Sequence, residues 1–180
     1  MRQLQTRADK LRLFNAVIAS FIAVFFLVHS VLGTATFVID DLTNDVPWLV
    51  WGMLGIMGVH VVASVCTTGM MLADTERPPS SRKKRHFLLK WATGVLLALV
   101  IVWHLLTAFS PEFLARTAIV TRAPFLLALA ALAWHVGIAT KSLARDLGIS
   151  KRSRDIMRGV YVVALGLLII ILSFCANPHG

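Results

Sequence analysis

Residues 89–109 have the sequence LKWATGVLLALVIVWHLLTAF, and this stretch decides the fold. After Lys90 it holds no charged side chain, and its one titratable group is His104. About twenty apolar residues in a helix cross the ~30 Å hydrocarbon core of a bilayer. The apolar residues are continuous rather than alternating, which argues against a membrane β-strand. The stretch therefore predicts a transmembrane helix that carries a single imidazole toward its far end.

Four further runs lack Asp, Glu, Lys and Arg over 18 residues or more: 13–39, 46–73, 123–140 and 159–180. The chain of 180 residues is 57% hydrophobic and 15% charged, and a soluble domain of this size could not bury so much apolar surface. We therefore predict an all-α integral membrane protein, a single domain over residues 1–180. The expected helices cover residues 13–38, 48–73, 88–109, 122–144 and 156–175. The first run is too long for the core of a signal peptide, so we expect a mature helix. Gly148 predicts the end of the fourth helix.

The basic residues are unevenly divided between the two ends of these helices. Of the 18 Lys and Arg residues, 16 fall on one side of the five-helix arrangement and only Arg116 and Arg122 on the other. This bias predicts a cytoplasmic N-terminus and an external C-terminus. It also explains the net charge of +9 without nucleic-acid binding. The basic segment SSRKKRH at 80–86 fits topology and attraction to anionic lipid, and a docking surface for a cytoplasmic partner is the alternative.

Four of the six histidines lie inside the expected helices, one in each of the first four. A rise of ~1.5 Å per residue places His29 and His104 roughly 20–24 Å above the inner boundary of the bilayer. The same rise places His60 and His135 roughly 12 Å above that boundary. The four imidazoles therefore form two layers. We expect His29 to pair with His104 in the outer layer and His60 with His135 in the inner layer.

Two neutral imidazoles that face each other across a bundle can ligate the iron of haem b from both sides. Such an iron suits electron transfer rather than oxygen binding. Ionisable groups inside a bilayer are costly and usually functional, which favours ligation over simple interhelical hydrogen bonding. A zinc or copper cluster would need three or four ligands at one depth. The sequence thus predicts four iron ligands and two haem b groups.

Small residues near these histidines would let a flat macrocycle approach the helices. They are Gly33, Gly55, Gly58, Ser64, Gly94 and Gly137. This signal is not specific, because small residues are common at any interface between membrane helices.

In combination, these features resemble the five-helix, di-haem cytochrome b anchor of succinate dehydrogenase and fumarate reductase, over most of the chain. KWATGVLLALVIVWHLL at 90–106 resembles the family's basic residue, Ser/Thr-Gly pair, apolar run and His-Leu. HVGIATKSLARDLG at 135–148 resembles its histidine followed by Gly-Ile, a basic stretch and Asp-x-Gly. HVVASVCTTGMMLADTERPP at 60–79 resembles its histidine helix with an Arg-Pro-like end. The chain is short for this family.

The resemblance implies two haem b groups with the same pairing of helices, in a complex of the bacterial cytoplasmic membrane. A cytoplasmic flavoprotein subunit would interconvert fumarate and succinate, so the dicarboxylate active site would lie on a partner. An iron–sulfur subunit would relay electrons to the inner haem. The anchor itself, embedded in lipid, would exchange electrons with menaquinone or another quinone. The direction of catalysis and the oligomeric state, including a dimer of complexes, stay open.

Charged residues near the two layers suggest further roles. Asp40, Asp41 and Asp45 could accept protons from a quinol near the outer haem, with ordinary loop acidity as the alternative. Lys141, Arg145 and Lys90 could pair with propionates of the inner haem, and Arg116 and Arg122 with those of the outer one. Simple topology signals explain the same basic residues equally well. No Asp or Glu lies inside an expected helix, so a carboxylate proton path across the membrane is not supported.

Two other functions are compatible with the same histidines. The first is a di-haem b subunit of another dehydrogenase, such as a hydrogenase or a nitrate or formate enzyme. The second is a non-redox membrane protein, a small transporter or assembly factor, whose histidines form hydrogen bonds. The histidine pattern does not separate the first alternative from the succinate or fumarate enzyme, whereas an optical spectrum separates the second.

Overall fold

The computed structural model describes residues 2–36, 47–73, 79–109 and 123–174. This part of the chain forms five α-helices, namely α1 (Arg2–Thr36), α2 (Pro47–Leu72), α3 (Ser81–Phe109), α5 (Ala123–Asp146) and α6 (Lys151–Phe174). Each contains a segment long and apolar enough to cross a membrane. The prediction of an all-α, multi-pass membrane protein with these five spans is confirmed.

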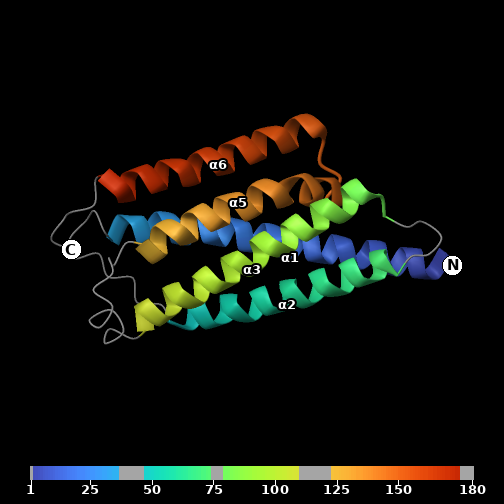
Figure 1. Ribbon diagram of the computed structural model, residues 1–180, viewed down its shortest axis with the longest axis horizontal. Coiled ribbons are helices and arrows are strands. Elements are labelled where there is room, and N and C mark those ends of the chain that lie inside the picture. The colour runs from blue at the N-terminus through green and yellow to red at the C-terminus, as the bar shows by residue number, and fades with distance from the viewer. Residues whose placement is uncertain (1, 37–46, 74–78, 110–122, 175–180) are drawn as a thin grey trace.

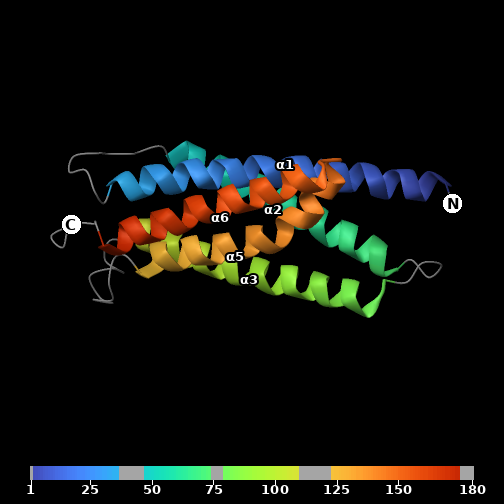
Figure 2. The same cartoon turned by 90° about the horizontal axis from the view of Figure 1, so that it is seen from above.

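The five helices run side by side and alternate in direction along one elongated bundle (Figure 1). We call the end at which α1, α3 and α6 begin, and α2 and α5 end, the basic end. Helix α5 is central and packs against α3, α6 and α1, whereas α2 packs closely against α1 only. Figure 2 shows α1 and α3 on opposite edges of the bundle. The bundle thus has a tightly packed side around α5 and a loosely packed side around α2.

The apolar core lies on the tightly packed side. Leu97 of α3, Leu129 and Leu132 of α5, and Leu165 and Leu172 of α6 are buried there in one cluster. Phe26 and Leu27 of α1 pack against it. Helices in lipid associate through close packing rather than through the hydrophobic effect. This cluster is therefore the part of the described structure that holds α1, α3, α5 and α6 together.

The connection between α5 and α6 is short and well defined. Gly148 has a positive φ of 72°, its N–H donates to the carbonyl of Arg145 at 3.0 Å, and the N–H of Ile149 donates to that of Ala144 at 2.8 Å. This pattern is a Schellman cap, so the predicted helix end at Gly148 is confirmed. The Oγ of Ser150 then accepts the N–H of Ser153 at 3.3 Å and caps α6.

Three helices extend further at the basic end than the sequence predicted. Helix α1 begins at Arg2, α3 at Ser81 and α6 at Lys151, instead of near residues 13, 88 and 156. The uncharged runs mark where the bilayer ends, but Lys and Arg are good helix formers and continue a helix into water. Ser80 begins α3, because its carbonyl accepts the N–H groups of Lys83 and Lys84 at 2.9 Å each.

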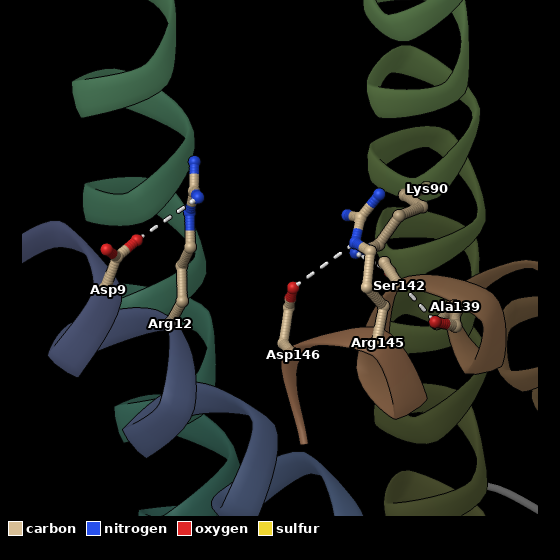
Figure 3. Close-up of polar contacts among 7 residues, drawn as sticks. All are labelled: Asp9, Arg12, Lys90, Ala139, Ser142, Arg145 and Asp146. Atoms are coloured by element: carbon tan, nitrogen blue, oxygen red, sulfur yellow. Dashed lines mark hydrogen bonds and ion pairs between the residues drawn. The ribbon is translucent and has the colours of Figure 1, made fainter. Parts of the chain in front are cut away.

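The extensions of α1 and α6, together with the end of α5 at Asp146 instead of 144, bring three aspartates into helices. They are Asp9, Asp146 and Asp155, and each lies at the basic end. Asp9 forms an ion pair with Arg12 at 3.6 Å, one turn further along α1 (Figure 3). Each aspartate lies outside the uncharged run of its helix, so they do not form a carboxylate path through the bundle.

Candidate functional site

The first histidine pair joins α1 and α3. The ring centroids of His29 and His104 lie 6.2 Å apart, and the ring planes are inclined by 74°. In the described structure the backbones of α1 and α3 make at most marginal contact with each other. The two imidazoles therefore approach each other although the backbones of their helices do not. The structure brings together the two residues that depth alone had paired.

The second pair joins α2 and α5. His60 and His135 are both half-buried. The backbones of α2 and α5, like those of α1 and α3, make at most marginal contact. Of the two expected pairs, His29 and His104 are the one for which a ring contact joins two such helices.

The four imidazoles face the interior of the bundle rather than lipid. All four are half-buried, although the preceding residues Val28 and Val59 are 52% and 47% exposed. His29 stacks on Phe25 with a centroid distance of 5.8 Å, and His104 meets Phe125 edge-on at 4.5 Å. The outer pair therefore has aromatic neighbours that restrict the rotation of both rings.

Two of the rings are not held by hydrogen bonds at Nδ1. The Nδ1 atoms of His60 and His104 are buried and have no hydrogen-bond partner among the described residues. By contrast, the Nδ1 of His135 lies 3.1 Å from the Oγ1 of Thr93. Of these three rings, His135 is thus the one whose Nδ1 has a side-chain partner in the described structure.

The two layers lie further apart than the sequence predicted. His135 contacts Thr93, and Thr93 precedes His104 by eleven residues, which is about 16 Å of helix. On α5, Phe125 contacts His104 and precedes His135 by ten residues, or about 15 Å. Both α3 and α5 thus give a distance of about 15 Å between the two histidine layers, whereas the depths estimated from the sequence give roughly 8–12 Å. The difference arises because the depths on α3 and α5 were counted from Trp91 and Ala123, and these two origins do not stand one bilayer thickness apart.

The geometry of the outer pair fits two axial ligands of one iron. Metal–nitrogen bonds of about 2 Å on each side place the centroids of two such imidazoles about 6 Å apart. The observed centroid distance is 6.2 Å. Among the described residues, no group of three or more His, Cys, Asp or Glu side chains is arranged to hold a metal ion.

The small residues near the histidines divide into two groups. Gly33, Gly55 and Gly58 have no atom within 4 Å of the position that a Cβ would take. These three fit the expectation that a flat group could approach α1 and α2.

The other three small residues have protein neighbours of their own. Gly94 faces the ring of His135, Gly137 faces Val162 of α6, and Ser64 exchanges hydrogen bonds with Asn15 of α1. The expectation that they make room for a macrocycle is not supported in this structure, because these neighbours take the space.

Lys90 is the basic residue best placed to act on the inner pair. Its Nζ donates a hydrogen bond to the Oγ of Ser142 at 3.0 Å, and that hydroxyl donates to the carbonyl of Ala139 at 2.9 Å (Figure 3). Lys90 lies three residues before Thr93, whose Oγ1 is 3.1 Å from the Nδ1 of His135. Lys90 thus lies at the boundary between α3, α5 and the inner histidines.

Lys141 and Arg145, the other two basic residues predicted near the inner haem, lie on the surface. The side chain of Arg145 is 67% exposed and pairs with Asp146 at 3.6 Å, and Lys141 is exposed. The remaining predicted residues, Asp40, Asp41, Asp45, Arg116 and Arg122, lie outside the described residues.

Sequence reasoning missed the contact between Thr93 and His135. A Thr-Gly pair on one helix and a histidine on another carry no shared pattern that predicts a contact. The sequence did draw attention to Lys90, Thr93 and Gly94, because they match the basic residue and Thr-Gly pair of the family described above. That match does not say which residue Thr93 contacts.

Comparison of the chain with protein-family models, curated proteins and solved structures gave no match. The fold and the site define the described part of the chain as a membrane protein with five long apolar helices and four half-buried histidines, of which His29 and His104 meet between helices.

Proposed function

We propose that the chain is the di-haem cytochrome b subunit of a succinate dehydrogenase or fumarate reductase complex in a bacterial cytoplasmic membrane. It would pass electrons between a membrane quinone and the iron–sulfur and flavoprotein subunits. The observation that carries the proposal is the meeting of His29 and His104, 6.2 Å apart, across two helices whose backbones make at most marginal contact. The second histidine pair, about 15 Å nearer the basic end, extends the proposal to two haems.

The protein would contribute axial ligands, a counter-charge and a dry environment. His29 and His104 would hold the outer haem, and His60 and His135 the inner one. Lys90 would pair with a propionate of the inner haem. Haem b bound in this way would supply one-electron redox chemistry. The surrounding apolar side chains exclude water and anions, so the charge of Lys90 is screened less than a surface charge would be.

The basic end supports the proposed partner subunits. Arg82, Lys83, Lys84 and Arg85 are exposed on the part of α3 that continues beyond its apolar segment. With this end in the cytoplasm, as the positive-inside rule expects, it would meet the iron–sulfur subunit there. The dicarboxylate site would then lie on the flavoprotein subunit. Asp40, Asp41 and Asp45 would receive quinol protons at the opposite end.

An optical spectrum tests the haem proposal. The full chain, produced in membranes with a sufficient haem supply and purified in detergent, should show reduced-minus-oxidised bands of b-type haem. Haem and protein quantification should give two haems per chain. A colourless protein after haem supplementation would favour the non-redox class instead.

Co-purification from native membranes tests the proposed complex. A tagged chain should retain a flavoprotein and an iron–sulfur subunit, with succinate or fumarate activity in the purified complex. Recovery of hydrogenase, formate or nitrate enzyme subunits would contradict this assignment while leaving the haem sites intact.

Replacing Lys90 by Met should lower the midpoint potential of the inner haem. Reduction removes one positive charge from the haem, so a nearby cation favours the reduced form. The loss of this cation should cost on the order of 1 kcal/mol, or about 40 mV for a one-electron couple. Redox titration of the two haems measures the shift. Lys141→Met is the matched control, because Lys141 is exposed and should leave both potentials unchanged.

A further inference from the structure

Thr93 lies between α3 and α5 and is almost completely buried, with 2% of its surface exposed. Its Oγ1 is 3.1 Å from the Nδ1 of His135, a contact between residues 42 positions apart in the sequence. Helices α3 and α5 pack closely along this region. The contact therefore belongs to the best-packed helix pair of the bundle and has little freedom to rearrange.

The surroundings of Thr93 favour one direction for this hydrogen bond. The Oγ1 of Thr93 lies 2.9 Å from the carbonyl of Leu89 and 3.1 Å from the carbonyl of Lys90. Carbonyl oxygens only accept, so a hydroxyl hydrogen that points to the backbone leaves Oγ1 as the acceptor toward His135. In that arrangement Nδ1 is the donor. In a neutral imidazole this leaves the free lone pair on Nε2.

Gly94 holds the same ring from a second side. A Cβ at this position would lie 3.3 Å from the Cε1 of His135 and 3.7 Å from its Nδ1. The shorter distance is tighter than ordinary van der Waals contact, so any side chain here would push the imidazole away from α3. The ring of His135 therefore rests directly against the α3 backbone, next to the threonine that accepts its N–H.

His60 and His104 lack this arrangement. His60, on the opposite side of the inner pair, has a buried Nδ1 without a partner, and the same holds for His104 in the outer pair. Thr93 thus acts on one imidazole of the inner pair. Of the inner pair, His135 is the imidazole whose tautomer and orientation are set by a side-chain hydrogen bond.

We infer that Thr93 is a positioning residue that selects Nε2 of His135 as the ligand of the inner haem iron, and that Gly94 leaves the space this orientation needs. The inference rests on the proposed haem function. A residue that accepts a hydrogen bond from a metal-ligating histidine fixes the tautomer of that histidine and raises its basicity. Loss of such a residue typically lowers metal affinity 10–100-fold. A more basic imidazole stabilises the ferric form, so Thr93 also lowers the potential of the inner haem.

Thr93→Val in the full holoprotein tests the inference, because valine keeps the shape and removes the acceptor. The inner haem should bind about 10–100-fold more weakly, and its midpoint should move to a higher potential. The outer haem should keep its potential and its electron paramagnetic resonance signal. Thr93→Ser, which restores a hydroxyl, should recover most of both properties of the inner haem.

Gly94→Ala gives a second, steric test. The added methyl group should displace the ring of His135 and change the resonance signal of the inner haem. Gly137→Ala is the matched control on α5, because a Cβ there would lie at an ordinary 3.8 Å from Val162. It should leave both haems unchanged.

The outcomes separate the two proposals. A wild-type chain that binds no haem would overturn the haem function and this assignment with it. Two bound haems whose affinities and potentials do not respond to Thr93→Val would overturn the role of Thr93 alone. Equal losses in Thr93→Val and Thr93→Ser would also overturn it, because the hydroxyl would then not be the cause.

Discussion

Alanine at any one of His29, His60, His104 or His135 should remove one of the two haems and leave the other in place. Such a variant would lose one of the two histidines proposed to hold that haem, and the remaining histidine alone would bind it weakly. The haem content of the purified chain should fall from about two to about one. The remaining optical and electron paramagnetic resonance spectra should be those of the haem whose two histidines are unchanged.

Double variants test the pairing itself. His29→Ala combined with His104→Ala should lose no more haem than either single change, because both ligands serve one iron. His29→Ala combined with His60→Ala should lose both haems. His86→Ala is the control, since this histidine lies near the basic end of α3, outside both pairs. Loss of both haems in the first double variant would refute the pairing seen in the structure.

Leu165→Ala should cause the largest loss of stability among conservative core changes. Leu165 is completely buried within the cluster that joins α3, α5 and α6. Leucine-to-alanine changes at buried sites cost 2–5 kcal/mol through lost contacts and the remaining cavity. We expect about 2–3 kcal/mol here, because lipid chains around the separated helices are as apolar as the core. Reversible unfolding in mixed detergent micelles measures this change.

Leu167 provides the matched control for Leu165. It lies two residues further along α6 and is 54% exposed, so it faces the surroundings of the bundle. Leu167→Ala should change the free energy of unfolding by less than about 0.5 kcal/mol. If both variants lost the same stability, the cluster between α3, α5 and α6 would not be the core that holds these helices together.

The amino-acid sequence alone predicted the five spans and the four histidines inside them, for one physical reason. A helix in a bilayer satisfies its own backbone hydrogen bonds and must be apolar along its whole length. Spans such as 123–140 are therefore local properties of the sequence. The fixed rise per residue then converts the position of His104 or His135 into a depth, and depth alone suggested which rings meet.

The same reasoning failed where it assumed that a helix ends with its apolar run. Helix α3 begins at Ser81 because the backbone at Ser80 caps it and the exposed basic residues that follow are compatible with a helix in water. The predicted spacing between the two histidine layers was also too small, because depths on α3 and α5 were counted from the ends of separate uncharged runs that do not lie at one level.

The sequence by itself determined the number of spans, their alternating direction and the two depths at which imidazoles lie. Only the tertiary structure decided that His135 rests on Thr93 and Gly94, that Lys90 reaches Ser142, and that Lys141 and Arg145 stay on the surface. The physical reason is that lipid and the bundle interior are equally apolar. The hydrophobic pattern of a membrane helix therefore does not reveal its rotation, which is set by the packing of α3 against α5.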